Sequence, residues 1–109
     1  MALSGLNTAD QFLVDGWNDS DELKRKIMDS WTERDGYLVK KFEFENFSEA
    51  FGFMTRVAME AERMQHHPTW KNEYNKLEIR LSTHDAGGVV TDRDKELSRR
   101  IDALLEASR

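Results

Sequence analysis

The chain has 109 residues, of which 34% are charged and 39% hydrophobic, and its net charge at pH 7 is −5. These values predict one soluble globular domain over residues 1–109, and they exclude a disordered chain and direct binding to nucleic acid, which requires a basic surface. The absence of cysteine excludes disulfides, thiolate zinc sites and a cysteine nucleophile.

Residues 1–30 carry the weakest pattern of the chain, and only one element is predicted in them. Asp19-Ser20-Asp21-Glu22 is typical of a helix start, because Glu22 can reach back as in a capping box. Apolar residues then follow at helical spacing, at Leu23, Ile27 and Met28. The pattern predicts a short helix over residues 20–29.

Two β-hairpins are predicted, one on each side of a long helix. The first runs from Trp31 to Glu45, and its Asp35-Gly36 pair is a strong signal for a two-residue turn. The second runs from Trp70 to Thr83, with a turn at Tyr74-Asn75. Its outgoing strand alternates charged and apolar residues, as expected when one face meets solvent, and the apolar ones are Leu77, Ile79 and Leu81.

The long helix begins at Asn46 or Ser48 and ends near Gln65 or His66, because Pro68 disfavours helical geometry at the residue before it. Its main apolar stripe consists of Ala50, Met54, Val57, Ala61 and Met64. A second stripe lies beside the first, at Phe47, Phe51 and Ala58. The two stripes indicate either one broad core face or a second face that contacts a partner subunit.

A last helix is predicted to begin at Thr91-Asp92-Arg93-Asp94. Its inward residues are Leu97, Ile101, Leu104 and Leu105. The predicted order is therefore helix-β-β-helix-β-β-helix. Because the strands form hairpins rather than helical crossovers, the sequence predicts an α+β fold, with a four-stranded antiparallel sheet and helices packed on one face.

All three histidines fall within 19 positions, at His66, His67 and His84. Histidine readily exchanges protons near neutral pH, so the clustering suggests proton transfer or metal ligation. Glu62 lies four residues before His66, hence on the same helical face, and the helix C-terminus also favours a charged imidazolium. We therefore expect Glu62 to support His66 as a proton donor. Pro68 favours extended geometry at His67, so we expect His67 to point in another direction than His66. His84, at a strand end, would complete a three-sided pocket.

Spacing alone leaves other interpretations open. Exposed histidines are common on surfaces, and a Glu–His pair four residues apart contributes only about 0.2–0.5 kcal/mol to a helix. Three imidazoles can also ligate zinc and leave an open catalytic position, although adjacent histidines are poorly spaced for this. Nucleophilic catalysis is not favoured, because no nucleophile-elbow motif surrounds Ser82 or Thr83.

Four motifs give a more specific indication. They are Ala50-Phe-Gly-Phe-Met-Thr-Arg-Val-Ala58, Glu62-x3-His66-His67-Pro68-x-Trp70, Tyr74-Asn75-Lys76 and Ser82-Thr83-His84-Asp85-x-Gly87-Gly88. Through these motifs the stretch from Trp31 to about Ile101 resembles the pterin-4a-carbinolamine dehydratases. In animals these proteins are also known as dimerisation cofactors of a homeodomain transcription factor.

The resemblance implies an enzyme that converts 4a-hydroxytetrahydrobiopterin (pterin-4a-carbinolamine) to quinonoid dihydropterin and water. This reaction serves tetrahydrobiopterin recycling for aromatic amino acid hydroxylases. The resemblance implies a catalytic set of His66, His67, His84 and Glu62, in which Glu62 supports the first histidine. We expect His66 and His84 to carry the two proton transfers and His67 to orient the pterin. The pterin is the substrate, and neither a cofactor nor a metal is expected.

Four substrate-binding residues are also implied by the resemblance. Trp70 matches an aromatic residue beside the site, although packing on the sheet explains it equally well. Ser82 and Thr83 would offer their backbone to the amide edge of the pterin. Asp94 matches an aspartate near the pocket. However, one additional residue precedes it, since Val89-Val90 stands where one apolar residue is usual, and a place in the first helical turn gives Asp94 a structural explanation.

A second function stays open, that of a protein–protein interaction module that acts as a dimerisation cofactor or transcriptional coactivator through its long helix. Members of the family are typically dimers or tetramers, so we expect a homodimer or homotetramer through residues 48–65, and a transcription-factor partner is compatible with this. No apolar run approaches the ~20 residues of a membrane span, and the N-terminus does not look like a signal peptide. The expected location is cytoplasmic, with the nucleus also open.

Overall fold

The computed structural model describes residues 30–107. This part of the chain contains a four-stranded antiparallel sheet and two long helices, so the predicted α+β fold is confirmed. The helix predicted over residues 20–29 lies outside the described residues.

Two hairpins form the sheet. Strands β1 (Thr32–Arg34) and β2 (Tyr37–Glu43) are joined by the predicted Asp35-Gly36 turn, whose residues have φ angles of 51° and 83°. Strands β3 (Thr69–Glu73) and β4 (Lys76–Leu81) are joined by the second predicted turn. The strand order is β1-β2-β4-β3, so the hairpins associate through antiparallel pairing of β2 with β4.

Helix α2 (Phe47–Met64) begins as predicted, because the Asn46 side chain accepts a hydrogen bond of 2.9 Å from the backbone N–H of Glu49. Helix α3 (Asp92–Ala107) ends the described chain. A short 3₁₀ turn, η1 (His84–Ala86), lies between β4 and α3 and was not predicted. Neither helix of the described part is long and apolar enough to span a lipid bilayer.

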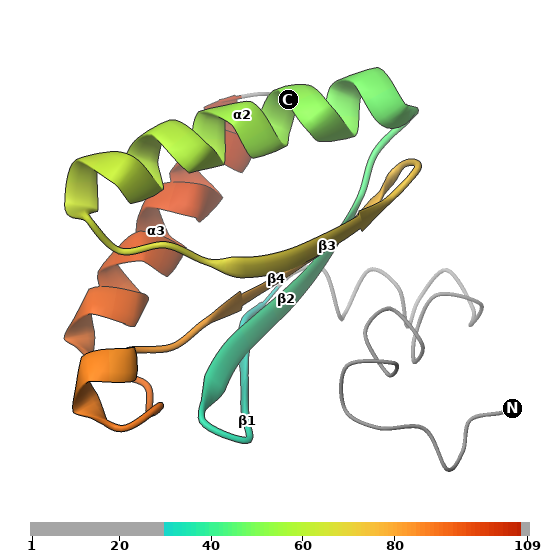
Figure 1. Ribbon diagram of the computed structural model, residues 1–109. Helices are drawn as coiled ribbons and strands as arrows, with labels where there is room; N and C mark the ends of the chain where they lie inside the picture. The colour runs from blue at the N-terminus through green and yellow to red at the C-terminus, as the bar shows by residue number, and fades with distance from the viewer. Residues whose placement is uncertain (1–29, 108–109) are drawn as a thin grey trace, which may run out of the picture.

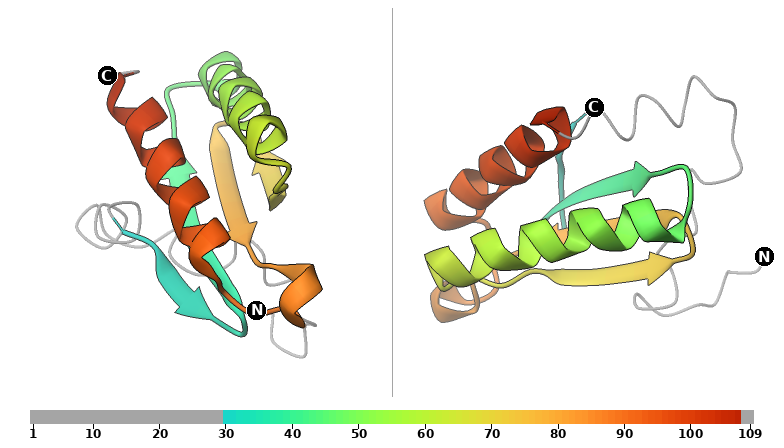
Figure 2. Two further views of the ribbon diagram at one scale, coloured as in Figure 1. Left: turned by 90° about the vertical axis from the view of Figure 1, so that its left-hand side faces the viewer. Right: turned by 90° about the horizontal axis from the view of Figure 1, so that it is seen from above.

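Both helices lie on the same face of the sheet (Figure 1), and the two turned views agree (Figure 2). One buried cluster joins the helices to β2 and β4, and it consists of Phe42, Phe53, Val57, Ala61, Leu77, Ile79, Leu81, Leu97 and Ile101. Phe53 is fully buried although it belongs to neither predicted stripe. The second predicted stripe, Phe47, Phe51 and Ala58, is exposed in the described structure.

Lys40 interrupts the apolar face of β2, and the structure explains why. Its ammonium group donates to Asp102 of α3 at 2.9 Å, and the indole N–H of Trp31 donates to the same carboxylate oxygen at 3.0 Å. The lysine side chain is buried, so the ion pair replaces part of the hydration that its charge loses. The contact ties β2 to α3.

Candidate active site

The three histidines line one hollow of about 310 Å³, where the exit of α2 faces the end of β4. The described residues that surround it come from the α2–β3 connection, from the segment after β4 and from the start of α3. They are Gln65, His66, His67, Pro68, Thr69, Ser82, Thr83, His84, Asp85 and Arg93. The predicted convergence of the histidines on one pocket is therefore observed.

The end of α2 separates the two adjacent histidines. Gln65 adopts the left-handed conformation, with φ 52° and ψ 44°. The N–H of Gln65 then donates to the carbonyl of Glu62, and the N–H of His66 donates to that of Ala61, each at 3.0 Å. This pair of bonds is a Schellman motif, which reverses the chain direction at a helix end. His66 is consequently buried, whereas His67 is exposed.

His66 pairs with Asp94, not with Glu62. The His66 Nε2 atom lies 2.5 Å from Asp94 Oδ1, and both side chains are buried. The prediction that Glu62 supports His66 was wrong, because the left-handed Gln65 takes His66 off the helical face that Glu62 shares. The structural explanation of Asp94 is confirmed but incomplete: its carboxylate accepts from the Thr91 N–H at the start of α3, and it is also the partner of a pocket histidine.

Asp94 is held in the charged form. Burial raises the pKa of this carboxyl, but hydrogen bonds from His66, from the Thr91 N–H and from the Thr83 hydroxyl together bring the pKa below its ordinary value. A carboxylate only accepts hydrogen bonds, so His66 Nε2 must carry the hydrogen. In the neutral form of the imidazole, the lone pair is therefore on Nδ1, which can accept a proton.

Glu62 instead pairs with His67. The His67 Nε2 atom lies 2.8 Å from Glu62 Oε1, and the side chains are 59% and 69% exposed. The hydrogen bond from His67, with a smaller contribution from Gln65, lowers the pKa of Glu62. Water screens this exposed pair, so its main effect is to restrict the orientation of the His67 ring.

The segment after β4 supplies polar groups to the pocket. The Ser82 hydroxyl is buried and has no hydrogen-bond partner among the described residues. The β3–β4 register would place Ser82 opposite His67, but β3 begins only at Thr69, so the backbone of Ser82 has no strand partner on that side. The Thr83 side chain is occupied by Asp94 and Thr91. His84 begins η1 and is exposed.

Two residues differ from expectation. Trp70 is absent from the described lining of the hollow and packs against the hydrophobic core, so sheet packing explains it. Arg93 lines the hollow although no motif pointed to it. The sequence offered one indication of this role: Arg93 is adjacent to Asp94, which the resemblance had placed near the pocket. Among residues 30–107, no three His, Asp or Glu side chains converge as metal ligands.

Replacing Gly36 with alanine is expected to destabilise the contact between the β1–β2 turn and the loop at Gly88. Gly36 has a positive φ, and a Cβ atom at this position would clash with the carbonyl oxygen of Gly88. We expect the free energy of unfolding, measured by denaturant titration, to fall by about 1–3 kcal/mol. Gly87→Ala is the matched control, because Gly87 shares the positive φ but has open space around it. Equal losses in the two variants would argue against the clash.

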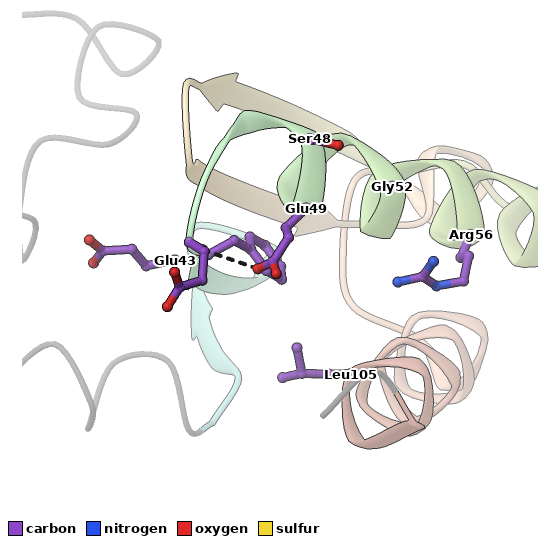
Figure 3. Close-up of a pocket in the computed structure, with 8 residues that line it drawn as sticks. Glu43, Ser48, Glu49, Gly52, Arg56 and Leu105 are labelled. Atoms are coloured by element: carbon purple, nitrogen blue, oxygen red, sulfur yellow. Dashed lines mark hydrogen bonds between the residues drawn. The ribbon is translucent and has the colours of Figure 1, made fainter.

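A larger hollow of about 710 Å³ lies at the opposite end of α2, beside the C-terminal part of α3 (Figure 3). The described residues around it are Glu43, Phe44, Glu45, Ser48, Glu49, Gly52, Arg56 and Leu105. They include no histidine, and the Glu49 side chain is already engaged by the backbone N–H of Glu45. Size alone therefore does not identify the functional site, and the chemistry favours the smaller, histidine-lined pocket.

Comparisons with known proteins agree with the motifs. The family described as pterin 4 alpha carbinolamine dehydratase matches residues 10–104. A protein from Prochlorococcus marinus, provisionally named a pterin-4-alpha-carbinolamine dehydratase, is 52% identical over 80 residues, covering 73% of this chain and 82% of its own. A protein from Christiangramia forsetii with the same provisional name is 52% identical over 85 residues, covering 78% of this chain and 87% of its own.

Two solved structures share the fold. The crystal structure of a transcriptional coactivator/pterin dehydratase from Brucella melitensis has a TM-score of 0.66 and 33% identity, covering 78% of this chain and 95% of that one. A pterin dehydratase-like protein identified as a RuBisCO assembly factor in the alpha-carboxysome has a TM-score of 0.59 and 24% identity. It covers 69% of this chain and 88% of its own. At this identity the second likeness shows the fold alone.

Proposed function

The chain belongs to the pterin 4 alpha carbinolamine dehydratase family, and from this premise we propose that it dehydrates 4a-hydroxytetrahydrobiopterin to quinonoid dihydropterin and water. The observation that carries the proposal is the hollow in which His66, His67 and His84 meet, with His66 paired to the buried Asp94. In such a role the protein would serve the recycling of tetrahydrobiopterin.

The reaction needs two proton transfers. The C4a–O bond breaks as the leaving hydroxyl receives a proton and departs as water. The N5–H bond gives up its proton, and its electrons form the new C=N bond. Each well-placed acid or base accelerates such a step by about 10²–10⁴-fold. The pocket therefore needs one protonated donor and one unprotonated acceptor.

His66 is suited to accept the N5 proton, and not to donate one as first expected from its place beside Glu62. Its Nε2–H is donated to the Asp94 carboxylate, which leaves Nδ1 as the acceptor and stabilises the imidazolium that forms. His84 is suited to donate to the leaving hydroxyl, because an exposed imidazole can recover a proton from solvent after each turnover. His67, restricted in orientation by Glu62, would hold the hydroxyl or the ring in place.

The Ser82-Thr83 segment is suited to bind the pterin. The buried hydroxyl of Ser82 and its backbone, which lacks a strand partner, can exchange hydrogen bonds with the amide edge of a flat heterocycle. A buried polar group without a partner is unfavourable until something binds it. Thr83 would contribute its backbone only, because Asp94 and Thr91 engage its side chain.

Turnover tests the proposal directly. The carbinolamine is generated in situ, and its ultraviolet decay is followed with and without the protein. Acceleration above the spontaneous rate that disappears in His84→Ala supports the enzyme and locates the site. A folded protein without acceleration contradicts the dehydratase assignment and leaves the interaction module as the remaining function.

A second function, association through α2, has its own supporting observation. Phe47 and Phe51 are 46% and 53% exposed, and their rings stack with centroids 5.7 Å apart. Apolar side chains grouped on one helix face commonly mark a protein contact. The relative from Brucella melitensis is named a transcriptional coactivator as well as a pterin dehydratase. We therefore propose a homo-oligomer, or a complex with a protein partner, that uses this face.

Phe51→Asp is expected to dissociate the oligomer, because a carboxylate at the centre of an apolar contact loses hydration without gaining a partner. Sedimentation analysis at micromolar concentration should show a dimer or tetramer for the wild type and a monomer for the variant. Ala103→Asp, at an exposed position of α3, is the control and should leave the mass unchanged. A monomeric wild type would contradict self-association.

A further inference from the structure

Arg93 connects the start of α3 to the exit of α2. Its guanidinium Nη2 donates a hydrogen bond of 2.7 Å to the backbone carbonyl of Gln65. That carbonyl belongs to the peptide that joins Gln65 to His66. The hydrogen bond therefore holds the peptide at which the chain leaves α2 and enters the segment that lines the pocket.

The peptide after Gln65 needs such a contact. A residue with a side chain disfavours the left-handed conformation that Gln65 adopts. Backbone hydrogen bonds to Glu62 and Ala61 hold the amide groups at this turn, but they leave the Gln65 carbonyl free. Rotation of the peptide would change the directions in which the next two residues, His66 and His67, leave the helix.

Two consecutive residues of α3 thus hold the same turn. Arg93 binds the backbone before His66, and Asp94 binds the imidazole of His66. We propose that Arg93 is a positioning residue for His66 and His67, acting through the Gln65 carbonyl. The inference rests on the proposed function of the pocket, because positioning matters only where the histidines do chemistry.

Arg93→Ala is expected to lower kcat by about 10-fold or more, as displaced catalytic groups do, with little change in KM. In ¹⁵N-labelled protein, the Nε2–H resonance of His66 should broaden or shift, because the ring no longer holds one orientation against Asp94. Arg93→Lys, which keeps a donor for the carbonyl, should recover part of kcat. In a Gln65→Gly background the loss should shrink, because glycine adopts the left-handed conformation readily.

Arg99→Ala is the matched control, since Arg99 is an exposed arginine of α3 that pairs only with Glu96 in the described contacts. It should leave both kcat and the His66 resonance unchanged. A raised KM with unchanged kcat and an unmoved His66 resonance in Arg93→Ala would overturn the inference, and would indicate that Arg93 contacts the substrate instead. If the wild type lacks dehydratase turnover, the proposed function fails, while the His66 resonance still decides whether Arg93 orders the turn.

Discussion

Replacing Asp94 with asparagine is expected to lower kcat for the dehydration by about 10²–10⁴-fold, the range of one lost acid–base group. The substitution preserves shape but changes the hydrogen-bonding partner of His66. A carboxylate obliges Nε2 to donate, whereas an amide can donate to Nε2 and so move the hydrogen to Nδ1. His66 would then present an N–H where the mechanism needs a lone pair. The measurement is kcat across pH 6–9.

Glu62→Gln provides the matched control, because it makes the same change of carboxylate to amide on the other histidine pair. The Glu62–His67 pair is exposed, and exposed ion pairs contribute only about 0–1 kcal/mol, so kcat should stay within about 5-fold of the wild type. A folded Asp94→Asn variant with nearly wild-type kcat would remove His66 from the proton transfers. Larger losses in Glu62→Gln would show that the Glu62–His67 pair takes part in the chemistry and does not only orient His67.

Asp94→Asn should also change the acid stability of the protein. The pKa of Asp94 is lower in the folded protein than its ordinary value, so its stabilising effect is present above about pH 4 and is lost as pH falls through the folded-state pKa. The variant lacks this titration. The difference in unfolding free energy between wild type and variant should therefore be largest at neutral pH and diminish at acid pH.

Alanine replacements of the three histidines are expected to have unequal effects. His66→Ala and His84→Ala should each lower kcat by about 10²–10⁴-fold, because each removes one proton transfer. His67→Ala should cost less and should raise KM, because His67 orients the substrate in the proposed mechanism. The contrast between a loss of kcat and a rise in KM distinguishes a proton-transfer role from an orienting role.

The double variant His66→Ala/His84→Ala adds a further check. Residues that act as a unit in one reaction lose activity non-additively, so the double variant should be little worse than the poorer single variant. Circular dichroism and thermal unfolding of each variant control for misfolding. Equal and small losses at all three positions would contradict acid–base catalysis, and the cluster would then be a binding site for the pterin without turnover.

Much of the described fold was predictable because its signals are local. The Asp35-Gly36 pair specifies a tight turn by the φ angles it tolerates, and Asn46 specifies a helix start by the side-chain oxygen it offers. Pro68 marked the end of α2 within one or two residues. Phe53 was missing from the predicted core, because the predicted main apolar stripe lay one position away along the helix. Its side chain is nevertheless among the most buried in the described structure.

The three histidines and their neighbouring motifs were enough to predict the family and to place His66, His67, His84, Ser82 and Thr83 at one pocket, but they did not point to Arg93. The pairing of these side chains became clear only from the packed fold. Helical spacing matched Glu62 with His66, but one left-handed residue, Gln65, reversed the backbone and gave His66 to Asp94, 28 residues away. Trp70 was likewise assigned to the core by the packing of the sheet. The physical reason is that periodicity and capping depend on hydrogen bonds between near neighbours, whereas the partner of a buried side chain depends on how separate elements pack.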